Sequence, residues 1–426
     1  MKRSVPISVI LSCLLFAACG DAGDLAATSD TSVFDGTTVD TVGDAQSSDT
    51  STPETIFDTT PSDASEETAN EVREVEGPLT GLKDDPTYLV PGNVATKTDV
   101  SAAGDLVAWV ESSGDDAPYL VVWNIATPDI GPRAFNPPNL AHPRALALSD
   151  AYLAYVDDRY GDPDVFAIDL ANGREVVVVN RAGAQEAPAI YGSRVAWEDC
   201  STCVTGDGIP GHEPRREVIE RDLAGGAEIA RSSDGVADRA PSYGLLADGR
   251  PALAWLSGRT TLRMERLEAG VSATLDMSPH IRIEQQLARV AVWNGRLAWR
   301  PNPLIVNPDS MIVNPDSMYP SDVFATDPSD GATVALTLHA ELAARMDIAP
   351  LAFGPRLAWL QIPAGIPATG RIMLASSPVG ESAPAMVAEA NGLTTFAMGR
   401  DFIVFSAPRV DNDGAEDVHV LRLDLP

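Results

Sequence analysis

Short runs of alternating apolar residues recur from about residue 85 to the end of the chain, and each run contains an aromatic residue. Clear examples are Leu106–Trp109, Arg194–Trp197 and Arg356–Trp359. An alternation with period two places every second side chain on one face, which predicts β-strands. The seven aromatics are Trp109, Tyr155, Trp197, Trp255, Trp299, Trp359 and Phe405. Successive aromatics lie 42 to 60 residues apart, a period that suits about four short strands per unit.

A second alternating segment follows most of these aromatics, as at Asp164–Leu170 and Asp417–Leu423. A glycine-containing turn such as Asn172-Gly173 and a short strand such as Glu175–Val179 come next. Each unit therefore contains four strands, A to D, with the aromatic on strand B. Only residues 338–346 have a helical pattern. Repeated four-stranded units predict an all-β fold, a single β-propeller of about seven blades, with six or eight blades as alternatives.

The chain ends predict how the ring closes. The last unit stops after its third strand, near Leu423. An unassigned strand, Thr87–Val90, precedes the first unit. We expect this N-terminal strand to complete the last sheet, because an open ring would expose two sheet edges. One aromatic per blade at a fixed strand position favours packing between blades over sugar stacking, and we expect Trp123 and Trp293 to be core residues too.

The segment Tyr152–Arg174 resembles the blade repeat of TolB-like and surface-layer-type (WD40-like) propellers. Those repeats carry an apolar strand with an aromatic, an Asp-x-Arg-x-Gly loop, an Asp-Ile-Tyr-like strand and a glycine turn. Here the matching stretches are Asp157-Asp158-Arg159-Tyr160-Gly161 and Asp164-Val165-Phe166. The resemblance implies a propeller architecture over residues 85–426 and implies no particular function.

The first residues have the pattern of an export signal. Lys2 and Arg3 precede an apolar run, Val5–Ala18, which is shorter than the roughly 20 residues of a membrane span. The sequence Leu15-Phe16-Ala17-Ala18-Cys19 resembles the lipobox of bacterial lipoproteins. That resemblance implies a signal peptide over 1–18 and acyl chains on Cys19, with unlipidated cleavage as the alternative. Gly20 after the cysteine favours, by the same resemblance, the bacterial outer membrane or cell surface, with a periplasm-facing position also open.

Residues 19–84 are rich in Asp, Glu, Ser and Thr and have no apolar period. Such a segment cannot bury enough apolar surface to offset its ordering entropy, so we expect a disordered tether. The whole chain has a formal charge of −31, and both the tether and the propeller are acidic. This charge argues against a nucleic-acid partner and against membrane contact other than through the lipid anchor.

Two cysteines remain after the proposed signal and anchor, Cys200 and Cys203. In an oxidising envelope, a short-loop disulfide is the first interpretation of Cys-Ser-Thr-Cys. Free thiols, or a metal site with His212 from the same loop, are the alternatives.

Asp411, Asp413 and Asp417 alternate around Gly414, a spacing that can wrap Ca²⁺ with oxygen ligands. The loop around Asp157 and Asp164 is similar, although Arg159 could pair with its carboxylates instead. A structural turn or a salt bridge is the favoured interpretation of both loops. We expect no other cofactor.

Loop lengths differ between the two faces of the predicted ring. Most of the extra length lies in the B–C connections (157–163, 198–216, 300–321, 361–370, 406–417) and the D–A connections (232–241, 276–286, 339–349, 378–393). In a four-stranded meander both classes emerge on the same face, which we call the long-loop face. Long loops on a rigid scaffold are where binding usually occurs.

No catalytic motif is present: Gly-x-Ser-x-Gly, His-Glu-x-x-His and phosphate-binding glycine loops are all missing. The sequence therefore favours a non-catalytic recognition or scaffold propeller whose partner is an envelope or extracellular protein or a glycan. The alternative is a carbohydrate-active or other hydrolase that uses carboxylates in the central funnel.

Overall fold

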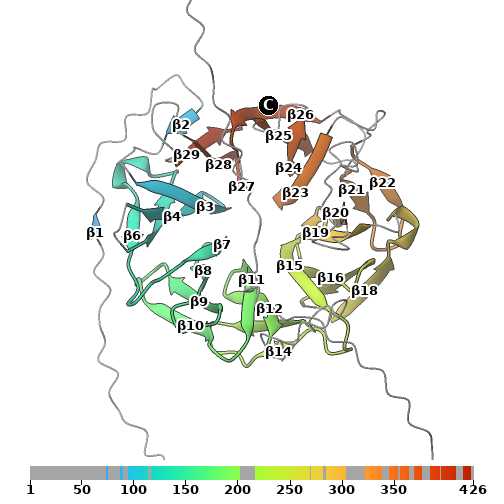
Figure 1. Ribbon diagram of the computed structural model, residues 1–426. Helices are drawn as coiled ribbons and strands as arrows, with labels where there is room; N and C mark the ends of the chain where they lie inside the picture. The colour runs from blue at the N-terminus through green and yellow to red at the C-terminus, as the bar shows by residue number, and fades with distance from the viewer. Residues whose placement is uncertain are drawn as a thin grey trace, which may run out of the picture. The chain divides into compact units, whose positions relative to one another are not determined.

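The computed structural model describes residues 73–74, 87–89, 95–113, 117–201, 216–268, 270–281, 285–303, 322–337, 345–353, 356–363, 369–376, 384–393, 395–408 and 416–423. Within them, seven antiparallel sheets form a ring of blades (Figure 1). The all-β propeller with seven four-stranded blades predicted from the aromatic repeat is confirmed.

Blades 1 to 4 follow one another around the ring, each running from an inner strand to an outer strand. Their strands are β3 (Thr96–Ala103), β4 (Leu106–Ser112), β5 (Tyr119–Asn124) and β6 (Arg133–Phe135); β7 (Arg144–Leu148), β8 (Tyr152–Asp157), β9 (Asp164–Asp169) and β10 (Glu175–Val179); β11 (Ala184–Tyr191), β12 (Arg194–Cys200), β13 (Glu217–Asp222) and β14 (Ile229–Ala230); and β15 (Asp238–Leu245), β16 (Pro251–Ser257), β17 (Thr261–Arg266) and β18 (Val271–Asp276).

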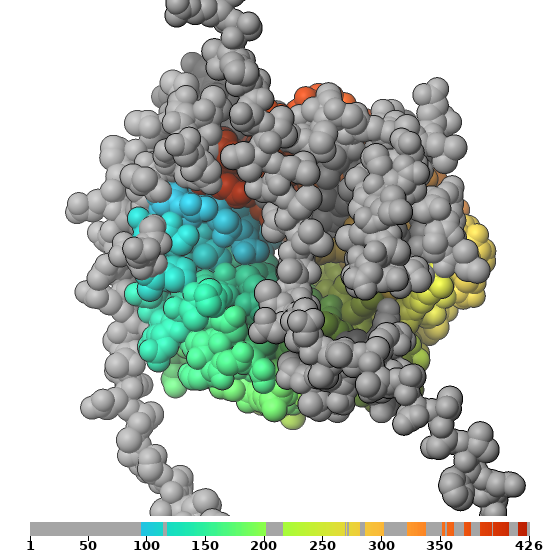
Figure 2. Space-filling view, in the orientation of Figure 1, coloured from blue at the N-terminus to red at the C-terminus, as the bar shows by residue number. Residues whose placement is uncertain are grey.

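Blades 5 to 7 complete the ring with the same order, and the last blade lies beside the first (Figure 1 and Figure 2). Their strands are β19 (Gln285–Trp293), β20 (Arg296–Pro303), β21 (Phe324–Thr326) and β22 (Thr333–Ala335); β23 (Arg345–Phe353), β24 (Arg356–Pro363), β25 (Thr369–Ser376) and β26 (Ala385–Asn391); and β27 (Thr395–Met398), β28 (Phe402–Pro408), β29 (Glu416–Arg422) and β2 (Thr87–Leu89).

The ring closes as the chain ends predict. Strand β2 pairs antiparallel with β29, with Thr87 opposite Leu421 and Leu89 opposite His419, so the N-terminal strand is the fourth strand of the last sheet. A further short strand, β1 (Arg73–Glu74), pairs with β6 and makes blade 1 five-stranded. Strand β1 falls inside the segment predicted as a tether; the rest of that segment lies outside the described residues.

The repeated aromatics lie between neighbouring blades. Trp197 packs with Val156 and Val165 of blade 2, and its side chain is fully buried. All seven aromatics of the B strands are buried, as are Trp123 and Trp293, so the core interpretation is confirmed. Burial of each large side chain stabilises the fold by roughly 1.5–3 kcal/mol, and the set locks the blades together.

The inner strands of blades 1 to 6 carry a β-bulge. In blades 1 to 4 the bulge places Asp99, Ala145, Ala187 and Ala240 at φ values of 52°, 52°, 49° and 50°, and the pairing register shifts there. Left-handed backbone in a non-glycine residue costs on the order of 1–3 kcal/mol, so its recurrence at one position is a built feature of the ring.

Two predictions about connections were wrong. Residues 385–391 form β26, so most of the 378–393 range is not a D–A connection on the long-loop face. Residues 345 and 346 begin β23, so the predicted helix does not extend to 346; residues 338–344 lie outside the described residues. Only two 3₁₀ turns, Pro128–Ile130 and Ser278–His280, interrupt the strands of the described part. In the described part of the chain, no helix is long and apolar enough to cross a bilayer.

Candidate functional site

Buried polar residues gather where the B strands end and the A and C strands begin, at the long-loop face. The residue two positions after the aromatic is polar in five blades: Glu111, Asp157, Asp199, Ser257 and Gln361, each no more than 6% exposed. Because side chains two apart share one face of a strand, these residues continue the inter-blade row of aromatics toward the long-loop face. Charged groups buried there require partners, since an unpaired buried charge is costly.

In blade 2, Arg159 provides those partners. Its Nε donates to Asp157 at 2.8 Å, and its Nη2 lies 3.0 Å from Glu175. The guanidinium also lies over the Phe166 ring, 4.2 Å from the centroid. Asp157 accepts a further hydrogen bond from the backbone N–H of His142 at 3.0 Å. The salt-bridge interpretation of this loop is thus the one that the structure bears out.

Between blades 3 and 4, Arg216 has the same role. Its Nη1 lies 2.7 Å from Glu198 and 3.3 Å from Glu186, and these two glutamates are directly opposite each other in the β11–β12 register. Glu198 also accepts the backbone N–H of Ala240, the bulge residue of the next blade, at 2.7 Å. A carboxylate of one blade therefore binds the bulge of its neighbour.

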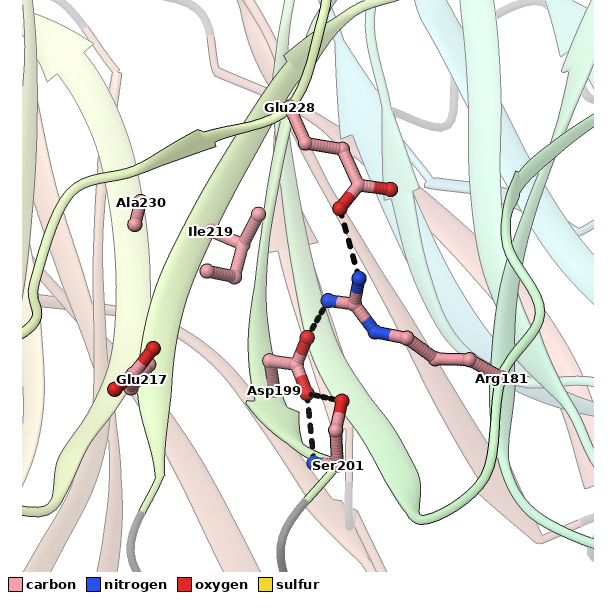
Figure 3. A pocket seen from close by; sticks show the side chains of 7 residues that line it. All are labelled: Arg181, Asp199, Ser201, Glu217, Ile219, Glu228 and Ala230. Atoms are coloured by element: carbon pink, nitrogen blue, oxygen red, sulfur yellow. Dashed lines mark hydrogen bonds and ion pairs between the residues drawn. The ribbon is translucent and has the colours of Figure 1, made fainter. Parts of the chain in front are cut away.

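The junction of blades 2 and 3 holds an open cavity of about 390 Å³, which we call the Asp199 pocket (Figure 3). Its lining residues are Arg181, Asp199, Ser201, Glu217, Ile219, Glu228 and Ala230. The pocket adjoins the ends of β12 and β13, between which residues 202–215 lie outside the described part of the chain.

Arg181 is the central cation of the Asp199 pocket. It forms ion pairs with Asp199 and, at 2.8 Å, with Glu228, and Figure 3 shows it between the two carboxylates. Asp199 also accepts the backbone N–H of Ser201 at 2.7 Å. The loop that carries Arg181 packs tightly on β12: Gly183 has φ +89°, and a Cβ there would lie 2.4 Å from the Cys200 carbonyl oxygen. Only glycine fits that approach.

Glu217 is the exception in the Asp199 pocket. It is the direct cross-strand neighbour of Asp199, and its carboxylate has no hydrogen bond or ion pair with the described residues. With three carboxylates and one guanidinium, the pocket has a net negative charge. It can therefore accept hydrogen bonds from hydroxyl or ammonium groups of a ligand.

Burial raises the pKa of several carboxyls at this face. The pKa of Asp164, at the start of β9, rises to about 6 because burial disfavours its charge, although the backbone N–H of Arg181 opposes the shift. Burial also raises the pKa values of Asp99, Asp238 and Glu416. These shifts follow from the cost of placing charge in a poorly solvated site.

The residues singled out from the sequence fall in different places. Cys200 ends β12, is buried and is disulfide-bonded, but Cys203 lies outside the described residues, so their pairing stays a prediction. Asp417 is buried in β29, 3.6 Å from the Lys97 ammonium. Cys19, His212, Asp411 and Asp413 lie outside the described residues. Where side chains are described, no three potential metal ligands come together.

Arg159 was recognisable in the sequence as a partner for the carboxylates of its own loop, whereas the bridging roles of Arg181 and Arg216 were missed. The polar residue two places after the aromatic was a readable signal for Asp157 and Asp199, one carboxylate each of the Arg159 and Arg181 bridges. Arg181 and Arg216 come from aperiodic connections, and Glu228 is 47 residues from Arg181 along the chain. No local pattern predicts such partners.

No protein-family model matches the chain, and no curated protein is similar to it in sequence. Among solved structures, it is similar to a prolyl endopeptidase with 12% identity and a TM-score of 0.53, over 78% of this chain and 48% of that one. This chain thus spans about half the length of that peptidase. It is also similar to the β-propeller domain of the Trilobed protease from Pyrococcus furiosus, with 10% identity and a TM-score of 0.50, over 78% of this chain and 100% of that one.

TolB from Acinetobacter baumannii is also among the similar structures, with 14% identity over 68% of this chain and 63% of that one. Its TM-score of 0.38 is too low to carry an argument. The likenesses to the two peptidase structures show the propeller fold and nothing beyond it.

Proposed function

We propose that this protein is a non-catalytic recognition or scaffold module that binds an envelope or extracellular protein, or a glycan, through its long-loop face. The observation that carries this proposal is the pairing of arginines with carboxylates at this face. Arg159, Arg181 and Arg216 each bridge two carboxylates. These bridges hold the strand ends rigid beneath the long loops, as a binding platform requires.

The same pairing argues against catalysis at these carboxylates. A general acid or base must exchange its proton with the substrate and needs a pKa near the working pH. A carboxylate whose oxygens are bonded to a guanidinium is fixed in place and has fewer lone pairs free to contact a substrate. The likeness to peptidases supports no enzyme either, because the Pyrococcus match is by its own description a propeller domain, and this sequence lacks Gly-x-Ser-x-Gly.

A hydrolase is the second candidate, and one observation favours it. Asp199 and Glu217 are direct cross-strand partners that line one pocket. Most glycoside hydrolases use a pair of carboxyl groups for catalysis. Hydrolysis of a glycan by the full-length protein, lost in Glu217→Gln, would establish this function in place of the first.

We further propose that the lipid on Cys19 and the acidic tether hold the propeller at the bacterial envelope. Two hydrocarbon chains suffice for stable anchoring, whereas one gives only reversible binding. Metabolic labelling with a fatty acid should label the wild type and leave Cys19→Ala unlabelled. Equal labelling of both proteins would contradict the anchor.

Two exposed apolar residues test which face binds. Tyr160 is 60% exposed in the B–C connection of blade 2, on the long-loop face. Ile130 is 77% exposed in the C–D connection of blade 1, on the opposite face. Both can be replaced by serine without creating a cavity.

Wild-type protein and the two variants are used to enrich partners from envelope extracts. Tyr160→Ser should lose most of the co-purified partner, because exposed aromatics at an interface often contribute 2 kcal/mol or more, while Ile130→Ser should retain it. Loss with Ile130→Ser alone would place the partner on the other face.

A further inference from the structure

The strand that blade 5 presents to the central channel carries a cation, Arg289, that has no hydrogen bond or ion pair with the described residues. The seven inner strands surround this channel. In each blade, the residue just before the aromatic pairs with a residue of the inner strand. The inner-strand position two residues before that partner is equivalent in every blade. That position is Asp99 in blade 1, Arg289 in blade 5 and Thr395 in blade 7, and alanine in the other four. Arg289 is therefore the one cation among these seven positions.

Arg289 differs from the arginines of the loop-face junctions. Arg159, Arg181 and Arg216 each hold two carboxylates, whereas the Arg289 side chain is exposed and has no hydrogen bond or ion pair with the described residues. Its guanidinium interacts electrostatically with Glu198 of blade 3, two blades away around the ring. An interaction with a non-adjacent blade means that the Arg289 charge acts across the channel.

The surroundings of Arg289 favour an anion. Although the Arg289 side chain is exposed, protein atoms surround it, and the resulting loss of hydration lowers the pKa of its guanidinium. Arg300, only 8% exposed, is its direct cross-strand partner in the β19–β20 register. Like charges opposite each other in a sheet repel, and an anion between them removes the repulsion. Arg300 has contacts of its own, so the group available to a ligand is Arg289.

Elsewhere at the same level, the fold already places anions. The bulge N–H of Ala240 binds the Glu198 carboxylate, and that of Ala145 binds Asp99. Blade 5 departs from this arrangement: its register shift falls one residue earlier, between Leu287 and Arg289, and Arg300 replaces the carboxylate that blade 3 has at Glu198. The side of the channel formed by blade 5 is thus positive where blade 3 is negative.

We propose that Arg289 forms an axial site for a carboxylate group of the bound ligand, which it holds with the paired N–H groups of its guanidinium. A guanidinium matches a carboxylate with two parallel hydrogen bonds. This inference rests on the proposed binding function and adds one chemical property of the ligand. The carboxylate can come from a peptide C-terminus or from an acidic sugar.

Two matched probe pairs separate these sources. Calorimetry compares glucuronate with glucose, and an acetylated dipeptide acid with its amide, on the full-length protein at low ionic strength. The acid of at least one pair should bind at least tenfold more tightly than its neutral counterpart, as expected for a charge-assisted hydrogen-bonded pair. The pair that shows the difference identifies the source.

Variants of blade 5 provide the control. Arg289→Gln should remove the difference between acid and neutral probe. Arg296→Gln should retain it, because Arg296 follows the A–B turn of the same blade, on the opposite face. Without ligand, Arg289→Gln should melt at or above the temperature of the wild type, since it removes an unpaired cation.

Three results would overturn the axial site: equal binding of acid and neutral probes by the wild type in both pairs, unchanged discrimination by Arg289→Gln, or a loss of several degrees in its melting temperature. None of them bears on the comparison of Tyr160→Ser with Ile130→Ser. Failure of the axial site and failure of the loop-face proposal are therefore distinguishable.

Discussion

Single residues decide how charge is buried in this protein. Arg159 has a side chain only 1% exposed, and it satisfies Asp157 and Glu175 together. Without it, both carboxylates would be left unpaired in a poorly solvated site. Such a loss costs more than the ion pair contributes by itself, because the desolvation penalty of the remaining charges is no longer compensated.

Arg159→Met should therefore lower the free energy of unfolding by about 3–5 kcal/mol in urea titrations. Arg174→Met is the control within the same blade, because Arg174 is exposed and its side chain has no ion pair with the described residues. That change should cost less than about 0.5 kcal/mol. Equal effects of the two substitutions would contradict the role of Arg159.

Asp164 gives the fold a pH dependence of a defined sign. Its pKa is 3.8 in the unfolded reference and about 6 in the folded protein, so the folded state binds the proton more tightly. The stabilisation that Asp164 contributes to the folded state is present below about pH 4 and is lost as the pH rises toward and through 6.

Asp164→Asn keeps an oxygen that can accept the Arg181 N–H and removes the titration. Relative to this variant, the wild type should lose between about 1 and 3 kcal/mol between pH 4 and pH 7. Thermal melts of both proteins across that range measure the difference. Parallel curves would show that Asp164 keeps an ordinary pKa.

At the scale of strands and blades, the sequence was most informative. The period-two runs, with an aromatic on each B strand, were sufficient to predict the blades. The aromatic recurs in every unit because its side chain packs between neighbouring sheets. The closing strand was predictable because the last unit lacked a fourth strand. The bulges of the inner strands and the bridges made by Arg181 and Arg216 were not predictable, because they depend on residues far apart in the sequence that share no local pattern.

Ring closure makes a testable contribution. Strand β2 pairs through Thr87, Tyr88 and Leu89 with β29. Deletion of residues 87–90 should cost about 3 kcal/mol, roughly 1 kcal/mol for each backbone hydrogen bond lost, and should promote association through the exposed edge of β29. Deletion of residues 36–39 in the tether should change neither the stability nor the association of the protein. Light scattering and thermal melts measure both effects; unchanged behaviour after the first deletion would contradict closure through β2.

The whole molecule carries a formal charge of −31. Such an excess of like charge destabilises the compact state by self-repulsion, and salt screens it. The buried ion pairs respond less, because screening acts mainly on exposed charges.

The melting temperature should consequently rise by a few degrees between 10 and 300 mM sodium chloride. A fall over that range would mean that exposed ion pairs, rather than repulsion, dominate the electrostatics of the fold.

Whether the long-loop face binds the partner is tested most directly by photo-crosslinking in the native cell. A photoreactive phenylalanine analogue is placed at Tyr160 on that face or at Ile130 on the opposite face. Binding through the long loops predicts a specific adduct from position 160 and none from position 130. An adduct from position 130 alone would contradict it.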